Sequence, residues 1–364
     1  MKRSSAGAGI GNVLKTAGAY MAWVIGSGFA TGQEVLQFFS AYGYMSFAVA
    51  GINLAGFVLF GYWLMRAGYE NKDVPGFNHF RFFCGQKPGA VYSWLVSATL
   101  LLLIPVMISG GGETLREYYG IPKPIGSAVF AAAVLAVYLI GFEKMVGIIS
   151  KIGPVIILFS LLVGVISLFR GGGWEKIPAF DGLFASRRSA PTWWLSGLLY
   201  LGLNFFPGST YFTRLGSTAK SKKELTAGAI CGGILLVLSI AVMSTAILLH
   251  GDTVAQLDIP ILSLARDISA VLGTAFSVIL VLGIFSSCSA MVWTVCSYLS
   301  VKIRRNALTA VGVILFGYVV SLFSFGTLVS TVYPLIGYVG LVFLACVAWK
   351  SIRKKRPAAK QDSQ

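Results

Sequence analysis

Charged side chains are scarce in this sequence. They make up 12% of the 364 residues, whereas about a quarter of an ordinary soluble domain is charged. The mean hydropathy is +0.78, and 56% of the residues are hydrophobic. Apolar runs of about 20 residues, long enough to cross a bilayer as a helix, recur from one end of the chain to the other. These features exclude an ordinary soluble protein and predict an all-α polytopic membrane protein.

The residues on which many enzymes and metal sites depend are also few. The sequence has two histidines, His79 and His250, which fall on opposite sides of the predicted membrane. It contains no HExxH, no GxSxG and no zinc-ligand spacing, so it does not indicate an enzyme or a cofactor. The five cysteines form no disulfide framework, because all but one lie within apolar runs. They are Cys84, Cys231, Cys288, Cys296 and Cys346.

A glycine-rich stretch, VIGSGFATGQE at residues 24–34, has the look of a dinucleotide-binding turn. Such a turn needs a short strand before it and a soluble helix after it. Here long apolar segments lie on both sides of the glycines. The stretch therefore does not indicate a nucleotide site, and a primary pump would need a partner chain.

Ten apolar spans are predicted along the chain. Together they form a single transmembrane domain over residues 1–350, followed by a polar cytoplasmic tail at 351–364. The first span is too long in its apolar part for a cleaved signal. The spans are expected near 12–41, 43–66, 89–118, 122–141, 146–169, 190–213, 225–250, 270–301, 307–325 and 327–349.

The distribution of basic residues predicts the orientation. With ten spans and the N-terminus inside, 22 of the 29 Lys and Arg residues fall on the cytoplasmic side. This bias predicts a cell-membrane protein with both termini in the cytoplasm. It also accounts for the net charge of +16 without a nucleic-acid partner. The basic run KSIRKKRP at 350–357 is expected to lie at the lipid surface. The oligomeric state is not indicated.

Glycine and proline interrupt two of the spans at matching positions. The first span carries Gly26 and Gly28, and the sixth carries Pro207 and Gly208 within YLGLNFFPGSTYF. The two stretches lie about 180 residues apart, and later spans recur at similar offsets. Since each copy has an odd number of spans, the second copy enters the membrane from the opposite side. The pattern predicts two inverted five-helix repeats, about 12–169 and 190–349, with spans 1 and 6 broken.

A broken helix inside a bilayer leaves backbone groups free to bind ligands. Unwound backbone survives there only where it lines a cavity. The outer half-helix would begin near Phe29 and present N–H groups to an anionic group. The inner half-helix would end near Ile25, and its free carbonyls could hold a cation. The alternative is close helix packing, for which glycine is common in membranes.

Two motifs resemble those of a known family. WVIGSGFATGQEVLQFF, residues 23–39, resembles the first span of the YkvI-like membrane proteins, permeases of the amino acid–polyamine–organocation superfamily. IGSGF also resembles the Gly-Ser-Gly break of amino acid permeases, and YLGLN in span 6 is similar to a Tyr-x-x-x-Asn pattern of the YkvI-like group. The resemblance implies the LeuT-type fold, with two inverted repeats and broken spans 1 and 6. The resemblance indicates the class of transport mechanism but not the identity of the solute.

The same resemblance implies a sodium site between spans 1 and 8. In sodium-coupled LeuT-type transporters, a Ser/Thr pair and a carbonyl of span 8 join two carbonyls of span 1. LGIFSSCSA in span 8 supplies such a pair. The alternative is that these serines only bond to their own helix or to neighbouring helices. The implied sodium ligands are Ala22, Ile25, Gly283, Ser286 and Ser287.

The solute site is expected where the two breaks face each other. Asn204 would offer both a donor and an acceptor there. The predicted substrate-binding residues are Gly26, Ser27, Gly28, Phe29, Tyr200, Leu203 and Asn204.

Ionisable residues at membrane depth usually face a polar pathway. Glu34 follows the first break by about two helical turns, so we expect it and Gln33 in the outer vestibule. Glu113 in span 3 is a further vestibule candidate, with pairing to Arg116 as the alternative. Lys151, at the start of span 5, is either a snorkelling anchor or an ammonium that replaces sodium, as in proton-coupled relatives.

The sequence therefore predicts a secondary active transporter that works by alternating access. Its solute is expected to be a small organic molecule, namely an amino acid or a related zwitterion or amine, and its coupling ion is expected to be sodium. A proton-coupled or facilitative permease that uses Lys151 is the first alternative. A membrane receptor that does not transport is the second.

Overall fold

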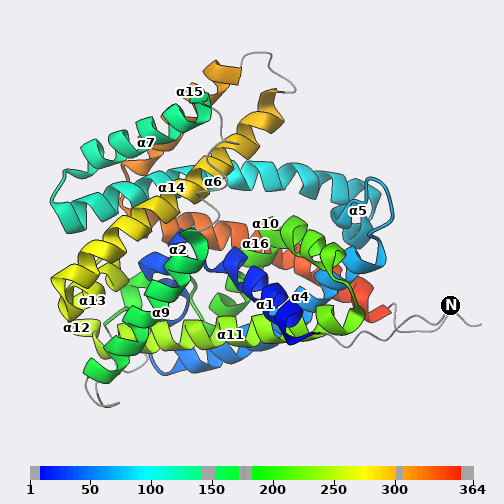
Figure 1. The fold of residues 1–364 in the computed structure, drawn as a ribbon, viewed down its shortest axis with the longest axis horizontal. Coiled ribbons are helices and arrows are strands. Elements are labelled where there is room, and N and C mark those ends of the chain that lie inside the picture. Colours follow the sequence, from blue (N-terminus) through cyan, green and yellow to red (C-terminus); the bar gives the residue numbers. More distant parts are fainter. Residues whose placement is uncertain are drawn as a thin grey trace, which may run out of the picture.

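The computed structural model describes residues 9–140, 152–171, 175, 177, 183–300 and 306–353, and these contain helices and no strand (Figure 1). Most of the helices are long, and several short ones lie between them in the chain. The helices are α1 (Ile10–Val24), α2 (Ser27–Thr31), α3 (Gln33–Phe38), α4 (Met45–Glu70), α5 (His79–Cys84), α6 (Gln86–Tyr119), α7 (Lys123–Ile140), α9 (Ile152–Arg170), α10 (Trp193–Thr218), α11 (Lys222–Leu249), α12 (Gly251–Val254), α13 (Pro260–Ile268), α14 (Ala270–Ser300), α15 (Asn306–Ser321) and α16 (Phe325–Arg353), with 3₁₀ turns η1 (Ser40–Tyr42) and η3 (Ala185–Arg187).

A helix of the structure lies on each of the predicted apolar spans. Six of the described helices, α4, α6, α7, α11, α14 and α16, are long and apolar enough to cross a membrane. Shorter apolar helices cover residues 155–170 of α9 and 307–321 of α15. The chain is therefore an all-helical, multi-pass membrane protein, as the sequence predicts.

Helix α10 lies at the centre of the fold, between α4 and α16. Small residues allow the backbones to approach closely: a Cβ atom on Gly340 of α16 would meet the carbonyl of Gly202 in α10. A Cβ atom on Gly216, near the other end of α10, would meet the carbonyl of Met65 in α4. Such small-residue contacts are the usual means of packing helices in lipid, where no hydrophobic driving force acts between them.

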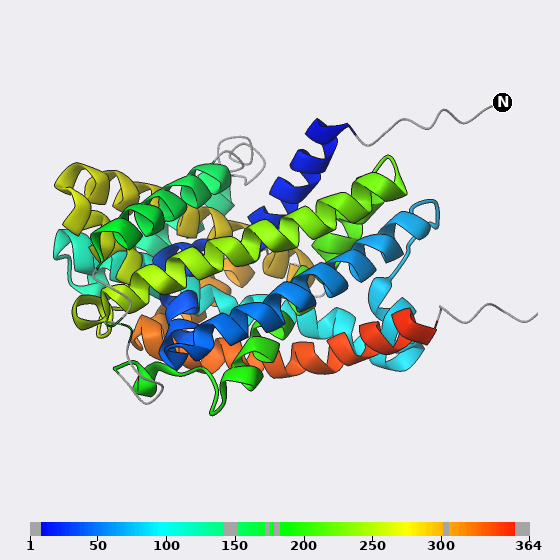
Figure 2. The ribbon, with the colours of Figure 1, turned by 90° about the horizontal axis from the view of Figure 1, so that it is seen from below.

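The remaining helices surround this centre. Helices α4, α11 and α16 run side by side along the long axis of the molecule (Figure 2). Helix α1 packs on α11, where Tyr20 covers Gly232 and donates a hydrogen bond to the carbonyl of Phe57 in α4 at 2.6 Å. Helix α6 crosses α14 on the side of α1 that is opposite to α11 (Figure 1).

The first predicted span is divided into three short helices. Helix α1 ends at Val24, Gly26 is extended with φ −95° and ψ −165°, and α2 begins at Ser27. Gly32 then takes a left-handed conformation with φ +84°, which ends α2 and allows α3 to begin in a new direction. Glycine adopts this conformation without a steric penalty.

The break expected in the sixth span is not present, and this part of the sequence prediction is wrong. Helix α10 runs without interruption from Trp193 to Thr218 and contains Pro207. Proline removes one backbone hydrogen bond, but a helix packed on both sides tolerates that loss. Pro105 in α6 and Pro334 in α16 also lie inside continuous helices.

Candidate functional site

The break between α1 and α2 opens a short stretch of backbone at the centre of the fold. Ile25, with ψ +74°, and the extended Gly26 separate the two helices. The first hydrogen bond of α2 runs from the N–H of Ala30 to the carbonyl of Gly26 at 3.0 Å. The N–H groups of residues 27–29 therefore begin a helix and have no partner in a preceding turn.

The carboxyl group of Glu34 lies at this break. A Cβ atom built on Gly28 would collide with Glu34 Oε1 and lie 2.9 Å from the hydroxyl of Tyr333. The turn at Gly32 brings α3 back over α2, so Glu34 does not lie two helical turns above the break, as a straight helix would place it. Its expected place in the outer vestibule is corrected accordingly.

Two tyrosine hydroxyls face the Glu34 carboxyl. Tyr200 of α10 donates to Oε2 at 3.5 Å, and Tyr333 of α16 forms a second side-chain hydrogen bond. Glu34 is only 8% exposed, and Tyr200 is fully buried. In the described part of the chain, no lysine, arginine or histidine forms an ion pair with Glu34. Among the described residues, the groups that bond to this carboxyl are therefore neutral.

Helix α10 lies beside the break, against the last turn of α1. Asn204 and Leu203 are both buried there. The side-chain amide of Asn204 donates to the carbonyl of Tyr200 at 2.8 Å. Its backbone carbonyl accepts from the indole Nε1 of Trp23, in the last turn of α1, at 3.2 Å. Spans 1 and 6 thus meet through Trp23 and Asn204 and through Glu34 and Tyr200, and Phe29 is buried on α2.

Sequence reasoning missed two residues of this site, Tyr333 and Trp23. Tyr333 precedes Pro334 in the middle of the last apolar span, and a polar aromatic residue at that depth was the available signal. Trp23 stands at the start of the WVIGSGF motif, three residues before Gly26. Both were concealed because an aromatic side chain in a membrane span is usually a packing residue.

The two glutamines that follow the break lie in a buried polar network instead of an open vestibule. Gln37 donates to the carbonyl of Gly326, at the start of α16, at 2.9 Å. With its amide oriented to suit its neighbours, Gln33 accepts from Gln37 at 2.8 Å and from Arg187 at 3.3 Å. Arg187 in turn forms an ion pair with Asp258 at 3.1 Å. This network joins α3 to η3, to the segment before α13 and to α16.

Glu113 belongs to a separate cluster at the end of α6. It forms an ion pair with Arg116, one turn further along the helix, and lies 3.7 Å from the ammonium of Lys123. Its carboxyl is 1% exposed. The alternative interpretation of Glu113, a paired residue near the membrane surface, is the one that its contacts match.

The predicted sodium ligands lie on α1 and α14. Ala22 is exposed and Ile25 is buried at the break, whereas Ser286 and Ser287 are half-buried on α14, beside the buried Gly283. Helix α14 packs against α2. The described residues contain no cluster of three His, Cys, Asp or Glu side chains that would hold a metal, but a sodium site of carbonyls and hydroxyls would not require one. Lys151 lies outside the described residues.

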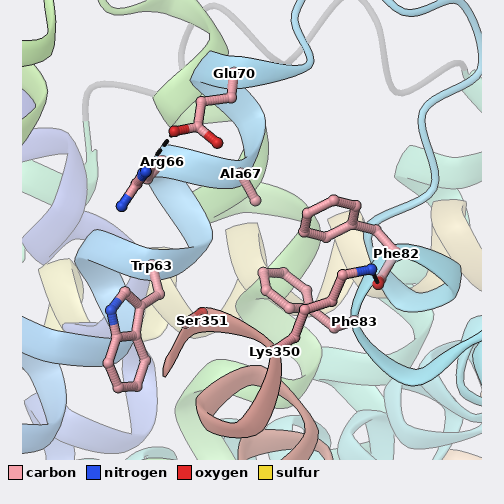
Figure 3. A pocket seen from close by; sticks show the side chains of 8 residues that line it. All are labelled: Trp63, Arg66, Ala67, Glu70, Phe82, Phe83, Lys350 and Ser351. Carbon is pink, nitrogen blue, oxygen red and sulfur yellow. Dashed lines mark hydrogen bonds and ion pairs between the residues drawn. The ribbon is translucent and has the colours of Figure 1, made fainter. Parts of the chain in front are cut away.

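A surface pocket elsewhere in the fold shares no residue with this site (Figure 3). It opens to solvent and contains about 340 Å³ of space between α4, α5 and α16. Its charged groups already have partners: Arg66 pairs with Glu70 at 2.6 Å, and Lys350 donates to the carbonyl of Phe82. The lining residues are Trp63, Arg66, Ala67, Glu70, Phe82, Phe83, Lys350 and Ser351.

Two Bacillus subtilis proteins are similar to this chain over almost its whole length. The uncharacterized membrane protein YkvI is 28% identical over 364 residues, which cover 95% of this chain and 98% of YkvI. The uncharacterized protein YyaD is 23% identical, covering 91% of this chain and 95% of YyaD. No family model matches the chain.

A solved structure shares the fold at low sequence identity. MhsT in complex with L-phenylalanine matches 92% of this chain and 86% of its own, with a TM-score of 0.54 and 16% identity. At this identity the likeness concerns the fold. The chain is thus a homologue of the membrane protein YkvI, with the LeuT-type fold that it shares with MhsT.

Proposed function

We propose that this protein is a secondary active transporter that moves a small organic solute, an amino acid or a related zwitterion or amine, across the cell membrane by alternating access. One observation carries the proposal: the break between α1 and α2 faces α10 and encloses a buried carboxyl with two tyrosine hydroxyls. Irregular backbone at membrane depth is tolerated where it lines a ligand cavity. MhsT, which shares the fold, was solved with L-phenylalanine.

The pairing of the helices supports ten spans in two inverted repeats, about 12–169 and 190–349. Helix α1 packs on α11, which pairs span 1 with span 7. Helix α10 packs on α4, which pairs span 6 with span 2. A two-fold relation between the repeats exchanges these two pairs, since it exchanges span 1 with 6 and span 2 with 7. The proposal has both termini in the cytoplasm, on the side that the basic residues favour.

The proposed solute site lies between the break and α10. The backbone at the start of α2, the Asn204 amide and the Tyr200 hydroxyl are its polar groups, and Phe29 and Leu203 are its apolar groups. All are buried or border the break. The site residues are Gly26, Ser27, Gly28, Phe29, Tyr200, Leu203 and Asn204, with Tyr333 and Glu34 added from their contacts.

Sodium is the proposed coupling ion. Its ligands would be the carbonyls of Ala22, Ile25 and Gly283 and the hydroxyls of Ser286 and Ser287. An ion held there would join the broken span 1 to span 8, so it would favour the state that accepts solute. Sodium should then raise solute affinity, and solute should raise sodium affinity by the same factor.

Uptake into proteoliposomes that contain the purified full chain tests the proposal. A panel of labelled amino acids, amines and nucleobases is tested with a sodium gradient, with a pH gradient and with neither. Sodium-driven uptake that weakens in Ser286→Ala/Ser287→Ala, but not in the control Thr294→Ala, supports sodium coupling. Thr294 is exposed on the same helix, and its hydroxyl donates to the carbonyl of Ala290 at 2.8 Å.

The contrary outcomes separate the alternatives. One such outcome is uptake that is independent of sodium, is driven by a pH gradient and is abolished by Lys151→Gln. That result would mean that the ammonium group of a span-5 lysine takes the place of the sodium ion. Solute binding without uptake under any gradient would indicate a receptor, and the transporter proposal would then be abandoned.

A further inference from the structure

Two of the buried carboxyl groups, those of Glu113 and Glu34, lie in very different surroundings. Glu113 is 1% exposed and lies beside the cationic groups of Arg116 and Lys123. Glu34 is 8% exposed and lies beside two phenol hydroxyls. The first carboxylate has its countercharges within the protein, whereas the second has none among the described residues.

Helices α2, α10, α11 and α16 pack against α3, the helix that carries Glu34. Helix α10 contributes Tyr200 and α16 contributes Tyr333, and these are the titratable groups in contact with the carboxyl. Helix α2 presents the bare backbone of Gly28. Helix α11 meets this region through Ser244, whose hydroxyl lies 3.0 Å from that of Ser40. None of these groups carries a charge at neutral pH.

An isolated carboxylate is costly at such a place. Burial of an ionised group without a countercharge is so unfavourable that the group instead takes up a proton or acquires a cation. Two phenol hydroxyls can each donate a single hydrogen bond, whereas a carboxylate has about four acceptor positions. The carboxyl therefore has acceptor capacity left for a further donor.

The aromatic residues around Tyr200 suit an organic cation more than a hydrated metal ion. The Tyr200 ring lies 5.3 Å from that of Phe38 and 5.0 Å from that of Phe39. Phe57 lies 6.2 Å from the same ring on a third side. Aromatic rings attract ammonium groups, and these apolar surroundings suit a cation that carries an alkyl group.

We propose that Glu34 binds the ammonium group of the solute and that a proton occupies the same carboxyl when the solute is absent. The proposal rests on the proposed transport function and names the solute class as organic ammonium compounds. The exchange is balanced: the protonated carboxyl releases its proton to water as the alkylammonium binds, and one positive charge replaces another. Solute and proton thereby compete for one group.

Modification by dicyclohexylcarbodiimide tests the proposal without knowledge of the natural solute. The reagent forms a stable adduct with protonated carboxyl groups in apolar surroundings, and mass spectrometry of the peptides locates it. The purified full chain is treated alone or with butylammonium chloride, butanol or sodium chloride at equal concentrations. We expect an adduct at Glu34 that butylammonium suppresses several-fold and that butanol and sodium chloride leave unchanged.

Glu113 provides the internal control, because a carboxylate paired with two cations should remain unmodified. A second measurement follows the protons: butylammonium should release about one proton per chain from the wild type and from Glu113→Gln, but none from Glu34→Gln. The melting temperature of Glu34→Gln verifies that the variant is folded. Glu34→Asp keeps the carboxyl and should keep proton release.

Three results would overturn the proposal: no adduct at Glu34, protection by sodium chloride but not by butylammonium, or equal proton release from Glu34→Gln. Each leaves the transport function intact if the proteoliposomes still accumulate a solute. Conversely, protection by butylammonium without uptake of any solute would overturn the transport function and leave Glu34 as a binding group for amines.

Discussion

The carboxyl group of Glu34 occupies the space that a side chain at residue 28 would need. A Cβ atom on Gly28 would collide with Glu34 Oε1 and lie 2.9 Å from the Tyr333 hydroxyl. A Cβ atom on Gly26, two residues earlier, would meet no atom within 4 Å. The two glycines of the break therefore have different roles, because only Gly28 makes room for the carboxyl.

This difference predicts the outcome of two alanine substitutions. Gly28→Ala should displace Glu34 and the Tyr333 hydroxyl, with an overpacking cost of about 1–3 kcal/mol. Solute binding, measured by thermal shift or uptake, should fall sharply. Gly26→Ala is the matched control and should bind nearly as the wild type does. Equal loss in both variants would mean that backbone freedom at the break matters more than the space at residue 28.

Substitution of Asn204 should affect solute binding more than it affects protein stability. Its amide donates to the carbonyl of Tyr200, and leucine would remove both a donor and an acceptor from the proposed solute site. Asn204→Leu should weaken solute binding by about 1–3 kcal/mol, the cost of an unsatisfied polar partner. Binding affinity of the folded variant, measured by calorimetry, checks this value.

Asn53 on α4 supplies the control. It is also buried and donates to a carbonyl one turn earlier, that of Val49, at 3.0 Å, but it is not part of the proposed site. Asn53→Leu should change the melting temperature and leave solute affinity unchanged. Unchanged binding in Asn204→Leu would place the site elsewhere.

The positions of the helices were predictable from the sequence because apolar length alone determines which segments can cross a bilayer. Each predicted span has its helix, from α4 at residues 45–70 to α16 at 325–353. The division of span 1 was also predictable, since the glycines of IGSGF weaken a helix at membrane depth. The prediction failed in span 6, where packing against α4 and α16 keeps α10 continuous through Pro207.

The chemistry of the site was less predictable because it depends on the direction that the chain takes after the break. From the sequence, Glu34 lies six residues beyond Gly28, or about 9 Å along a straight helix. The left-handed backbone of Gly32 turns the chain, so the Glu34 carboxyl lies against Gly28 instead. Tyr333 meets the same carboxyl from almost 300 residues further along the chain. No local pattern reports a contact over that sequence distance.

The predicted membrane topology places the two ends of α10 on opposite sides of the bilayer, which labelling can test. It contains 26 residues and is therefore about 39 Å long, enough to cross the hydrocarbon core of a bilayer. Ala185 and Lys220 are exposed on either side of it. On a cysteine-free background, Ala185→Cys should react with an impermeant maleimide on intact cells, and Lys220→Cys only after the cells are opened. Reaction of both from the same side would contradict ten spans with inverted repeats.

His79 predicts how stability depends on pH. It lies in α5, outside the candidate spans, and its Nε2 is 2.9 Å from the hydroxyl of Ser209 in α10. Burial lowers the pKa of His79 from 6.5 to about 4. Between these two values the unfolded chain binds a proton at this residue and the folded chain does not. The free energy of unfolding should therefore be highest above pH 6.5 and should fall as the pH is lowered towards 4, by up to about 3 kcal/mol.

The apparent melting temperature between pH 7.5 and pH 4.5, measured in about half-unit steps, checks this slope. His79→Gln cannot take up a proton but can still donate to the Ser209 hydroxyl, which itself donates to the carbonyl of Phe206 at 2.8 Å. This variant should lose much of the decline in melting temperature at acidic pH. His250→Gln keeps the buried imidazole and should retain the decline. An unchanged slope in His79→Gln would assign the acid sensitivity to other groups, because the protonation of His79 would then not distinguish the folded from the unfolded state.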